Sequence, residues 1–279
     1  MNIKYIAVDI DGTLLNREGK ILPLTKDALI EVQKKGIEVI LASGRPVKAM
    51  LGFAKELELE KYGGIIVSNN GAIGYDVKKH EIIFENPMDP KDVYDVLVHC
   101  EENNLVPMIE EGDYMLVRDV YEGVVDTGDF GRGRQNIIQS ESRSGNYYLK
   151  EIPSLKDYVD FNVNKILTIV EPAILEKERE QLSAPFDDRL YVAQTSPFYL
   201  EFMKKGINKA FGLEKLGVDP DYLMSFGDSL NDKEMIIFSD YGIAMGNAQQ
   251  EVKDAATYVT DDRDHEGIYK ALIHFGLVD

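Results

Sequence analysis

An apolar, strand-like segment ends in two aspartates in the stretch Tyr5-Ile6-Ala7-Val8-Asp9-Ile10-Asp11-Gly12-Thr13-Leu14. The glycine after the second aspartate lets the chain turn, which is typical of a strand end in an α/β sheet, where such folds carry their chemistry. Two carboxylates about 4 Å apart repel each other by roughly 4 kcal/mol at an effective dielectric constant near 20. We therefore expect a cation at this strand end, in particular a divalent metal ion.

Composition and charge narrow the possible partners. The chain has 279 residues, of which 44% are hydrophobic and 29% charged, as in an ordinary globular protein. Its formal net charge of -18 disfavours nucleic-acid binding, because that binding depends on Lys and Arg neutralising phosphates. The same charge repels anionic metabolites at long range, so a phosphate site would need its own local cations.

The sequence also indicates where the protein acts. No apolar stretch approaches the roughly 18 residues of a membrane span, and the first residues lack the pattern of a secretory signal. The single cysteine, Cys100, leaves no partner for an intramolecular disulfide and is interpreted as a small helix residue. We expect a cytoplasmic protein without a membrane partner, whose oligomeric state the sequence does not reveal.

Short apolar runs alternate with helix-like segments in the first part of the chain, a pattern typical of βαβ units and a parallel sheet. Strands are predicted over residues 3–9, 37–42 and 64–68, and helices from a cap at Thr25 to Lys35 and from Pro46 to about Leu57. Each predicted strand ends in polar residues. Three strand ends thus carry polar residues, at the position where an α/β sheet places its chemistry.

The middle of the chain has a different pattern. We predict a helix over 91–103, a hairpin of residues 106–110 and 114–118, and a long, irregular connection over the glycine-rich residues 123–145. Further strands over 165–170 and 190–194 flank a helix from Pro172 to about Leu182. The parallel pattern then resumes, with short strands over 223–226 and 241–244. The sequence thus predicts a core of residues 1–83 and 196–279 into which an α+β domain, residues 84–195, is inserted.

Four motifs in chain order resemble those of the haloacid dehalogenase (HAD) superfamily, and among its members the Cof-type, subclass IIB phosphatases. The motifs are Asp9-Ile10-Asp11-Gly12-Thr13, Ser43-Gly44-Arg45, Lys205-Gly206-Ile207-Asn208-Lys209 and Gly227-Asp228-Ser229-Leu230-Asn231-Asp232. The resemblance covers essentially the whole chain. It implies a Rossmann-like α/β core with an inserted cap domain that governs substrate specificity.

The resemblance also implies roles for the acidic residues. Asp9 would be the nucleophile, and Asp11 the general acid and base, which protonates the leaving group and then deprotonates the attacking water. Asp228 would complete a magnesium site with the Asp9 carboxylate and the Asp11 main-chain carbonyl, since hard oxygen ligands suit Mg²⁺. Asp232 would orient a bound water or Lys209 from outside this site. A helix N-cap is the alternative interpretation of the motif from Asp228 to Asp232.

Phosphate and substrate binding fall, by the same resemblance, to the residues Gly12, Ser43, Gly44, Arg45 and Asn231. Simpler interpretations are a helix cap for Ser43 and a surface ion pair for Arg45. Lys209 aligns with the catalytic lysine of the family, and Lys205 is the competing candidate for that role. The segment from Lys209 to Gly217 is about one helical turn shorter than the family pattern, which leaves the position of Lys209 open.

Two further segments have both a functional and a simpler interpretation. Residues Asn69-Asn70-Gly71-Ala72 resemble a strand end that faces the leaving group, although Asn-Gly is also a common turn. Asp261-Asp262-Arg263-Asp264 could approach the site from a late loop or could serve the N-terminal dipole of the last helix.

The function implied is a Mg²⁺-dependent phosphatase that hydrolyses small phosphate monoesters, in particular sugar phosphates, through an aspartyl-phosphate. Transfer of the phosphoryl group to another acceptor, as in phosphomutases of the same superfamily, is an alternative. A non-catalytic sensor of phosphorylated metabolites is another, because the short segment after Lys209 leaves the position of that lysine open.

Overall fold

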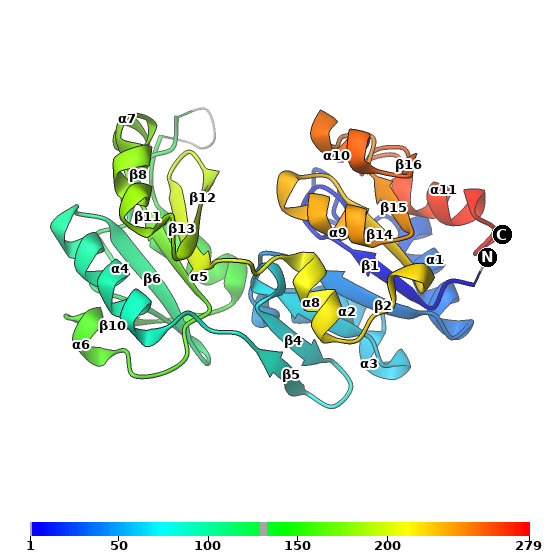
Figure 1. Cartoon of the computed structure of the whole chain (residues 1–279), viewed down its shortest axis with the longest axis horizontal. Coiled ribbons are helices and arrows are strands. Elements are labelled where there is room, and N and C mark those ends of the chain that lie inside the picture. Colours follow the sequence, from blue (N-terminus) through cyan, green and yellow to red (C-terminus); the bar gives the residue numbers. More distant parts are fainter. Residues whose placement is uncertain (1, 129–132) are drawn as a thin grey trace. The chain divides into compact units, whose positions relative to one another are not determined.

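The computed structural model describes residues 2–128 and 133–279, which form two separate units (Figure 1). The first unit comprises the residues up to Glu85 together with Ile207–Asp279, and the second comprises Asn86–Gly206. The second boundary lies later than the predicted start of the core at residue 196. The reason is that β13 (Tyr199–Lys204) pairs with β12 (Leu190–Ser196) and β11 (Lys165–Ile169), so it belongs to the sheet of the second unit.

The first unit is built on an eight-stranded sheet in the order β16-β15-β14-β1-β2-β3-β4-β5. Six neighbouring strands are parallel: β1 (Tyr5–Val8), β2 (Glu38–Ala42), β3 (Ile65–Ser68), β14 (Leu223–Gly227), β15 (Tyr241–Ala244) and β16 (Tyr258–Val259). The predicted parallel α/β core is therefore confirmed. The sheet continues with an antiparallel hairpin of β4 (Ile73–Asp76) and β5 (Glu81–Glu85), which the sequence analysis did not predict.

The strand order reverses at β1, which lies between β14 and β2. In the register of these three strands, Val8 pairs with Leu41 on one side and Phe226 on the other. The residues that follow the three strands therefore emerge at one edge of the sheet. In open α/β sheets a crevice forms outside the strand ends at such a reversal, which is where these folds bind ligands.

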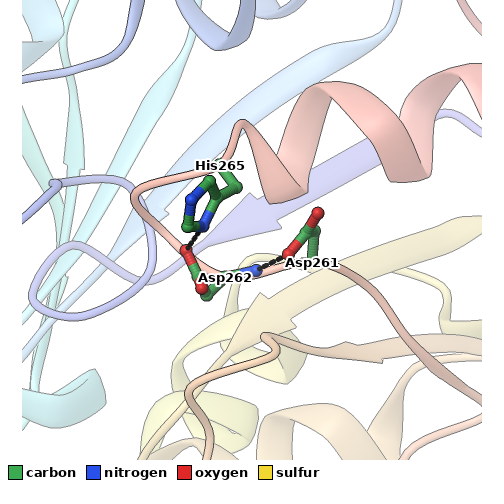
Figure 2. Close-up of side chains that lie close together, drawn as sticks. All are labelled: Asp261, Asp262 and His265. Atoms are coloured by element: carbon green, nitrogen blue, oxygen red, sulfur yellow. Dashed lines mark hydrogen bonds and ion pairs between the residues drawn. The ribbon is translucent and has the colours of Figure 1, made fainter.

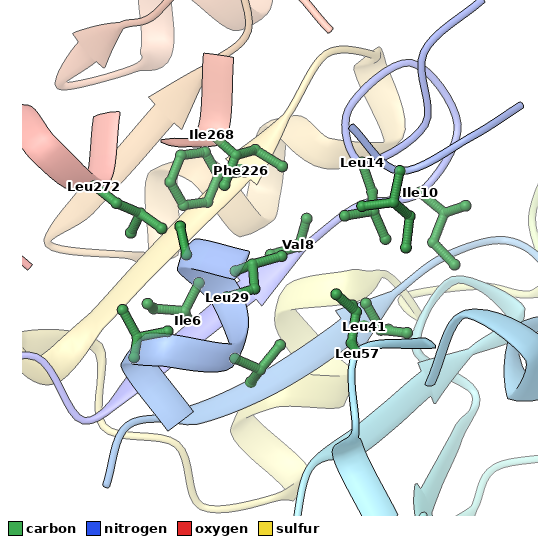
Figure 3. Packing of buried hydrophobic residues seen from close by; sticks show 14 of the residues in the cluster. Ile6, Val8, Ile10, Leu14, Leu29, Leu41, Leu57, Phe226, Ile268 and Leu272 are labelled. Atoms are coloured by element: carbon green, nitrogen blue, oxygen red, sulfur yellow. The ribbon is translucent and has the colours of Figure 1, made fainter. Parts of the chain in front are cut away.

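Helices cover both faces of this sheet, which is why its central strands are apolar on both sides. On one face Ile6 and Val8 pack with Leu29 of α1 (Pro23–Lys34) and Leu272 of α11 (Gly267–His274) (Figure 3). The same cluster takes in residues of α2 (Val47–Glu56) and α3 (Leu59–Tyr62). On the other face Ala7 packs with residues of α8 (Lys209–Lys215) and α9 (Lys233–Phe238), and α10 (Gln250–Ala255) joins a small cluster beside β15. Within residues 2–128 and 133–279, no helix is both long and apolar enough to cross a bilayer.

Thr25 does not cap the first helix, contrary to the prediction. The helix α1 begins at Pro23, with Leu22 at the cap position and no side-chain cap bond. Instead, the Glu266 carboxylate accepts hydrogen bonds from the amides of Leu24 and Thr25 at 3.1 and 2.8 Å, and from the Thr25 hydroxyl at 2.7 Å. A residue more than 200 positions away thus supplies the acceptor that a local cap would provide, and the local sequence does not reveal it.

The second unit is an α+β structure with a six-stranded sheet in the order β10-β7-β6-β11-β13-β12. The predicted hairpin is confirmed as β6 (Val106–Glu111) and β7 (Tyr114–Val117), and β10 (Tyr148–Glu151) pairs with β7. Its longer helices are α4 (Pro90–Glu102) and α7 (Pro172–Ser183), and a short helix α6 (Leu155–Tyr158) follows β10. Cys100 lies in a helix, as predicted, and its side chain is buried.

The predicted irregular connection over residues 123–145 is wrong for the part of it that the structure describes. Here β8 (Val124–Asp126) pairs with β9 (Arg134–Asn136), and α5 (Ile137–Gly145) follows directly. The Asn136 side chain caps α5 by accepting a hydrogen bond from the Gln139 amide at 3.0 Å, and Ile137 and Ile138 are buried. Burial of these two residues against the sheet stabilises a helix whose periodicity in the sequence is weak.

Two glycines allow α8 to lie unusually close to the turn after β3. A Cβ at Gly212 of α8 would lie 2.5 Å from the Val67 side chain and 2.9 Å from the Gly71 Cα, and a Cβ at Gly71 would overlap with the Asn208 carbonyl. Gly71 also has a φ of +104°, which side-chain-bearing residues rarely adopt. This close approach fixes the start of α8, and therefore Lys209, against the central strands.

We expect Gly212→Ala to lower the free energy of unfolding by about 1–3 kcal/mol, because the added methyl group overpacks this contact. Gly52→Ala in α2 is the matched control, since a Cβ there meets nothing within 4 Å, and it should stabilise the protein by about 0.5–1 kcal/mol through helix propensity. Urea unfolding of both variants measures the difference. Stabilisation by both substitutions would contradict the close packing of α8.

Candidate active site

The side chain of Lys209 lies between two carboxylates at the carboxyl edge of the core sheet. Its Nζ is 2.5 Å from the Asp9 Oδ1 and 2.5 Å from the Asp232 Oδ1. Lys209 and Asp232 are fully buried, and Asp9 is only 4% exposed. Three residues from distant parts of the chain therefore form one charged cluster inside the protein, directly beyond the end of β1.

Burial and charge shift the ionisation of this cluster. Burial and then the neighbouring Asp232 raise the pKa of Asp9 well above its ordinary value, although Lys209 opposes the shift. Burial lowers the pKa of Lys209, but the two carboxylates outweigh this effect and raise it above 10.5, so Lys209 is protonated at neutral pH. One ammonium group faces two carboxylates, and the site has an excess of negative charge.

Asp232 is held by the turn that follows β14. Its Oδ2 accepts hydrogen bonds from the amides of Asp228 and Ser229, both at 3.0 Å, and the Ser229 side chain accepts one in return within a capping box. Its Oδ1 is already occupied by Lys209. Both oxygens of Asp232 are therefore engaged, so this residue orients Lys209 and the turn. The N-cap interpretation of this motif and a role at the site are compatible.

Asp228 completes the acidic group beside Asp9. Burial and the charge of Asp232 raise the pKa of Asp228 to about 6. Its Oδ1 accepts a hydrogen bond from the Thr13 hydroxyl at 3.2 Å. The backbone at Gly12 lies directly beside the Asp228 carboxylate, with which a Cβ at this position would overlap. The φ of Gly12 is +92°. Only glycine allows the backbone after Asp11 to pass here.

These acids fit a hard divalent cation. Carboxylate oxygens of Asp9, Asp228 and Asp232 all lie within 4.8 Å of one another. Because Asp232 is engaged on both oxygens, Asp9 and Asp228 are the side chains available as ligands. Burial and then the charge of Asp232 raise the pKa of both carboxylates, so a bound cation would stabilise their ionised forms. An all-oxygen donor set is the one that Mg²⁺, Ca²⁺ or Mn²⁺ prefers.

Arg45 forms an ion pair with Asp11, in agreement with the simpler of the two interpretations of its sequence. Its Nε and a terminal guanidinium nitrogen each donate to one Asp11 carboxylate oxygen at 2.7 Å, so the pair is bidentate. The guanidinium carbon also lies 5.6 Å from the Phe53 ring centroid. The Asp11 side chain is 57% exposed, so it lies at the open side of the site, where a substrate can reach it.

The end of β2 approaches the end of β3 and the turn after β14. The Ser43 hydroxyl accepts a hydrogen bond from the Arg45 amide at 3.2 Å and is nearly buried. Gly44 lies against the Asn70 amide group, which in turn accepts a hydrogen bond from Asn231 at 3.1 Å. The helix α2 begins at Val47 with Pro46 at the N-cap position, so the Gly44 amide lies two residues before the cap.

The structure separates the two candidate lysines. Lys205 lies in the second unit, where its Nζ donates to the Asp187 carbonyl at 2.7 Å. Lys209 is the first residue of α8, and Asn208 caps this helix by accepting a hydrogen bond from the Phe211 amide at 2.9 Å. The short segment after Lys209 forms a complete seven-residue helix, and its length does not displace the lysine from Asp9.

Comparison with known proteins identifies the family. The model of the haloacid dehalogenase-like hydrolases matches residues 6–272. The chain belongs to the haloacid dehalogenase-like hydrolases. The 5-amino-6-(5-phospho-D-ribitylamino)uracil phosphatase YcsE of Bacillus subtilis is 28% identical to this hydrolase over 284 residues, covering 99% of this chain and 97% of that protein. The predicted membership in the superfamily and the prediction of a HAD-type phosphatase are confirmed at this level.

Solved structures give the same assignment. A haloacid dehalogenase-like hydrolase from Bacteroides thetaiotaomicron superposes with a TM-score of 0.85 at 28% identity, covering 98% of this chain and 99% of that one. The HAD subclass IIB sugar phosphatase BT4131 superposes with a TM-score of 0.79 at 25% identity, covering 99% and 100%. The predicted fold class is thereby confirmed.

The sequence analysis gave no role to two residues at this site. Thr13 was only part of the first motif, and Asn247 lies in the loop after β15. The Asn247 amide donates to the Gly12 carbonyl at 2.8 Å and approaches the Asp228 Oδ2 at 3.4 Å. A strand end followed by Gly246-Asn247 was the only signal available, and such a pair is also an ordinary turn.

Asp261 and Asp262 of the acidic loop over residues 261–264 form hydrogen bonds within the loop itself (Figure 2). Asp262 accepts hydrogen bonds from the Asp264 amide at 2.9 Å and from the His265 ring at 2.7 Å, and Asp261 forms an ion pair with Lys270 of α11 at 2.5 Å. Asp261 and His265 are exposed. These acids shape the loop at the start of α11 and extend no carboxylate toward Asp9 or Asp228 in any described contact.

We expect Lys209→Met to lower the free energy of unfolding by about 3 kcal/mol or more at pH 8, because it leaves two buried carboxylates without a cation. Since the pKa of folded Asp9 is already raised above its unfolded value, the folded variant takes up protons as the pH falls, and the deficit should shrink toward pH 5. Lys205→Met is the matched control and should have a small effect at both values. Urea unfolding at the two pH values tests this expectation. An equal loss in both variants would show that the buried cation contributes no special stability.

Proposed function

We propose that this hydrolase is a Mg²⁺-dependent phosphatase that hydrolyses small phosphate monoesters, with sugar phosphates as its substrate class. The observation that carries the proposal is the contact between the Asp9 carboxylate and the buried Lys209 ammonium, beside Asp228 at the carboxyl edge of the sheet. The sugar-phosphate class is supported by the similarity to the subclass IIB sugar phosphatase BT4131.

In the first step the Asp9 carboxylate attacks the phosphorus atom in line with the leaving oxygen. The P–O bond of the ester breaks, an aspartyl-phosphate forms, and Asp11 gives its proton to the departing alkoxide. The exposed position of Asp11 suits contact with the leaving group. Because Arg45 holds the Asp11 carboxylate in the absence of substrate, protonation of Asp11 requires that this ion pair loosens when substrate binds.

In the second step a water molecule attacks the phosphorus atom of the aspartyl-phosphate while Asp11 takes its proton. The bond between phosphorus and Asp9 breaks, and inorganic phosphate and the free carboxylate result. Lys209 stabilises the negative charge on Asp9 and on the transferring group throughout, since phosphoryl transfer depends mainly on positioning and positive charge. Asp232 keeps Lys209 in place.

A magnesium ion held by Asp9, the Asp11 main-chain carbonyl and Asp228 would add the positive charge that draws the phosphate oxygens toward Asp9. The remaining phosphate contacts are proposed for the Ser43 hydroxyl and the Gly44 amide. We further assign phosphate or substrate contacts to Gly12, Arg45 and Asn231, and leaving-group selection to the second unit as a cap. The substrates proposed are small phosphorylated metabolites of the cytoplasm, where the buried Cys100 thiol would stay reduced.

The decisive experiment measures inorganic phosphate released from sugar phosphates, nucleotides and pyridoxal phosphate, with Mg²⁺ and with excess chelator. We expect release that the chelator abolishes, fastest with sugar phosphates. Asp9→Asn should reduce turnover by about a thousandfold or more while the thermal midpoint changes little, because it removes the nucleophile and keeps the shape of the side chain.

Other outcomes of this assay would change the proposal. Transfer of phosphate to a second metabolite without phosphate release would favour a phosphotransferase or mutase. Thermal stabilisation by a phosphorylated compound without any turnover would favour a sensor. Near-normal release by Asp9→Asn would end the aspartyl-phosphate mechanism.

Magnesium binding should depend on pH, because the pKa of Asp228 is raised to about 6 and that of Asp9 is also raised. At pH 7.5 Mg²⁺ at 100 times its Kd should stabilise the fold by about 2.7 kcal/mol. Below pH 6 protons compete for the same carboxylates, so the stabilisation should fall. Thermal midpoints with and without Mg²⁺ between pH 5 and 8 measure this effect. Asp228→Asn should show little stabilisation at any pH, and a constant shift across the range would contradict the assigned ligands.

A further inference from the structure

Asn247 connects three segments of the first unit at the proposed cation site. It lies between β15 and α10, and its Nδ2 donates to the Gly12 carbonyl at 2.8 Å and approaches the Asp228 Oδ2 at 3.4 Å. Its Oδ1 accepts a hydrogen bond from the Arg263 amide at 3.0 Å. The reaction steps proposed above do not use this residue.

The hydrogen bond from Arg263 fixes the orientation of the Asn247 amide group. A backbone N–H can only donate, so the atom that faces it must be the amide oxygen. The nitrogen then faces the other way, and its two hydrogens are available to the Gly12 carbonyl and the Asp228 carboxylate, both of which are acceptors. A flipped amide would place an acceptor against both groups and lose all three interactions.

We propose that Asn247 is a positioning residue that holds Asp228 and the Gly12 carbonyl, one residue after Asp11, in place for the divalent cation, an inference that rests on the metal site of the proposed function. The two oxygens of Asp228 are then fixed separately, Oδ1 by the Thr13 hydroxyl at 3.2 Å and Oδ2 by Asn247. Both donors are neutral, so they orient the carboxylate without adding a charge that would compete with the cation. Groups in such outer contacts commonly set the affinity of a metal site.

The loop before α11 contacts Asn247 through the Arg263 amide and is itself bonded to a third segment of the chain. Asp264 of this loop accepts a hydrogen bond from the Arg17 amide at 2.9 Å and forms an ion pair with the Arg17 side chain at 3.1 Å. The loop thus contacts the segment after Gly12 directly through Asp264 and indirectly through Asn247. The bonds among Asp261, Asp262 and His265 that shape the loop (Figure 2) therefore help to present the Arg263 amide to Asn247.

The test is a direct titration with Mn²⁺, in which electron paramagnetic resonance measures the free ion and so reports binding without turnover. We expect Asn247→Ala to raise the Kd for Mn²⁺ by about tenfold or more. At saturating Mg²⁺, its kcat should return to within a few-fold of the wild-type value. Gln249→Ala is the matched control, because it shortens an exposed amide side chain of the same loop that has no side-chain cap bond. Its Kd for Mn²⁺ should not change.

The outcomes separate this inference from the proposed function. An unchanged Kd in Asn247→Ala would overturn the positioning role, even if the wild-type protein is an active phosphatase. An equal loss of affinity in Gln249→Ala would also overturn it, since the effect would then belong to the loop in general. Wild-type protein that binds no Mn²⁺ would overturn both the cation site and the role of Asn247. Wild-type protein that binds Mn²⁺ but releases no phosphate would overturn only the proposed function, provided that Asn247→Ala weakens binding.

Discussion

The buried lysine between two aspartates is the interaction on which the rest of the site depends. An ammonium group removed from water is stable only when carboxylates surround it closely, and Lys209 meets this condition with Asp9 and Asp232. The arrangement brings together the end of β1, the start of α8 and the turn after β14. One ammonium group does not balance the charges of the surrounding carboxylates, so the cluster that joins these three segments would be stabilised by a further cation.

Close backbone contacts make this arrangement possible. Gly71 and Gly212 allow α8 to lie directly on the turn after β3, which brings Lys209 within reach of Asp9. Gly12 lets the chain pass the Asp228 carboxylate with a positive φ. At each of these positions a side chain would collide with its neighbour, so the position of the charged groups depends on the absence of side chains near them.

Much of the core and of the site could be predicted from the sequence because the signals are local. Apolar runs that end in polar residues marked the parallel strands, and the order of the motifs indicated which side chains meet at the sheet edge. The irregular connection predicted over residues 123–145 failed because α5 is stabilised by the burial of Ile137 and Ile138 against distant strands. The cap expected at Thr25 failed because the acceptor comes from Glu266, far away in the chain.

Strand periodicity and residue chemistry were sufficient to predict an α/β core, an inserted α+β domain and an acidic site at the end of the first strand, because each of these features has a local signal in the sequence. The tertiary structure was needed to place Lys209 rather than Lys205 beside Asp9, to pair Arg45 with Asp11, and to bring Asn247 to Gly12 and Asp228. These contacts join residues separated by 18 to 235 positions. Their formation depends on sheet order, helix packing and the space that glycines leave, which no local pattern of residues encodes.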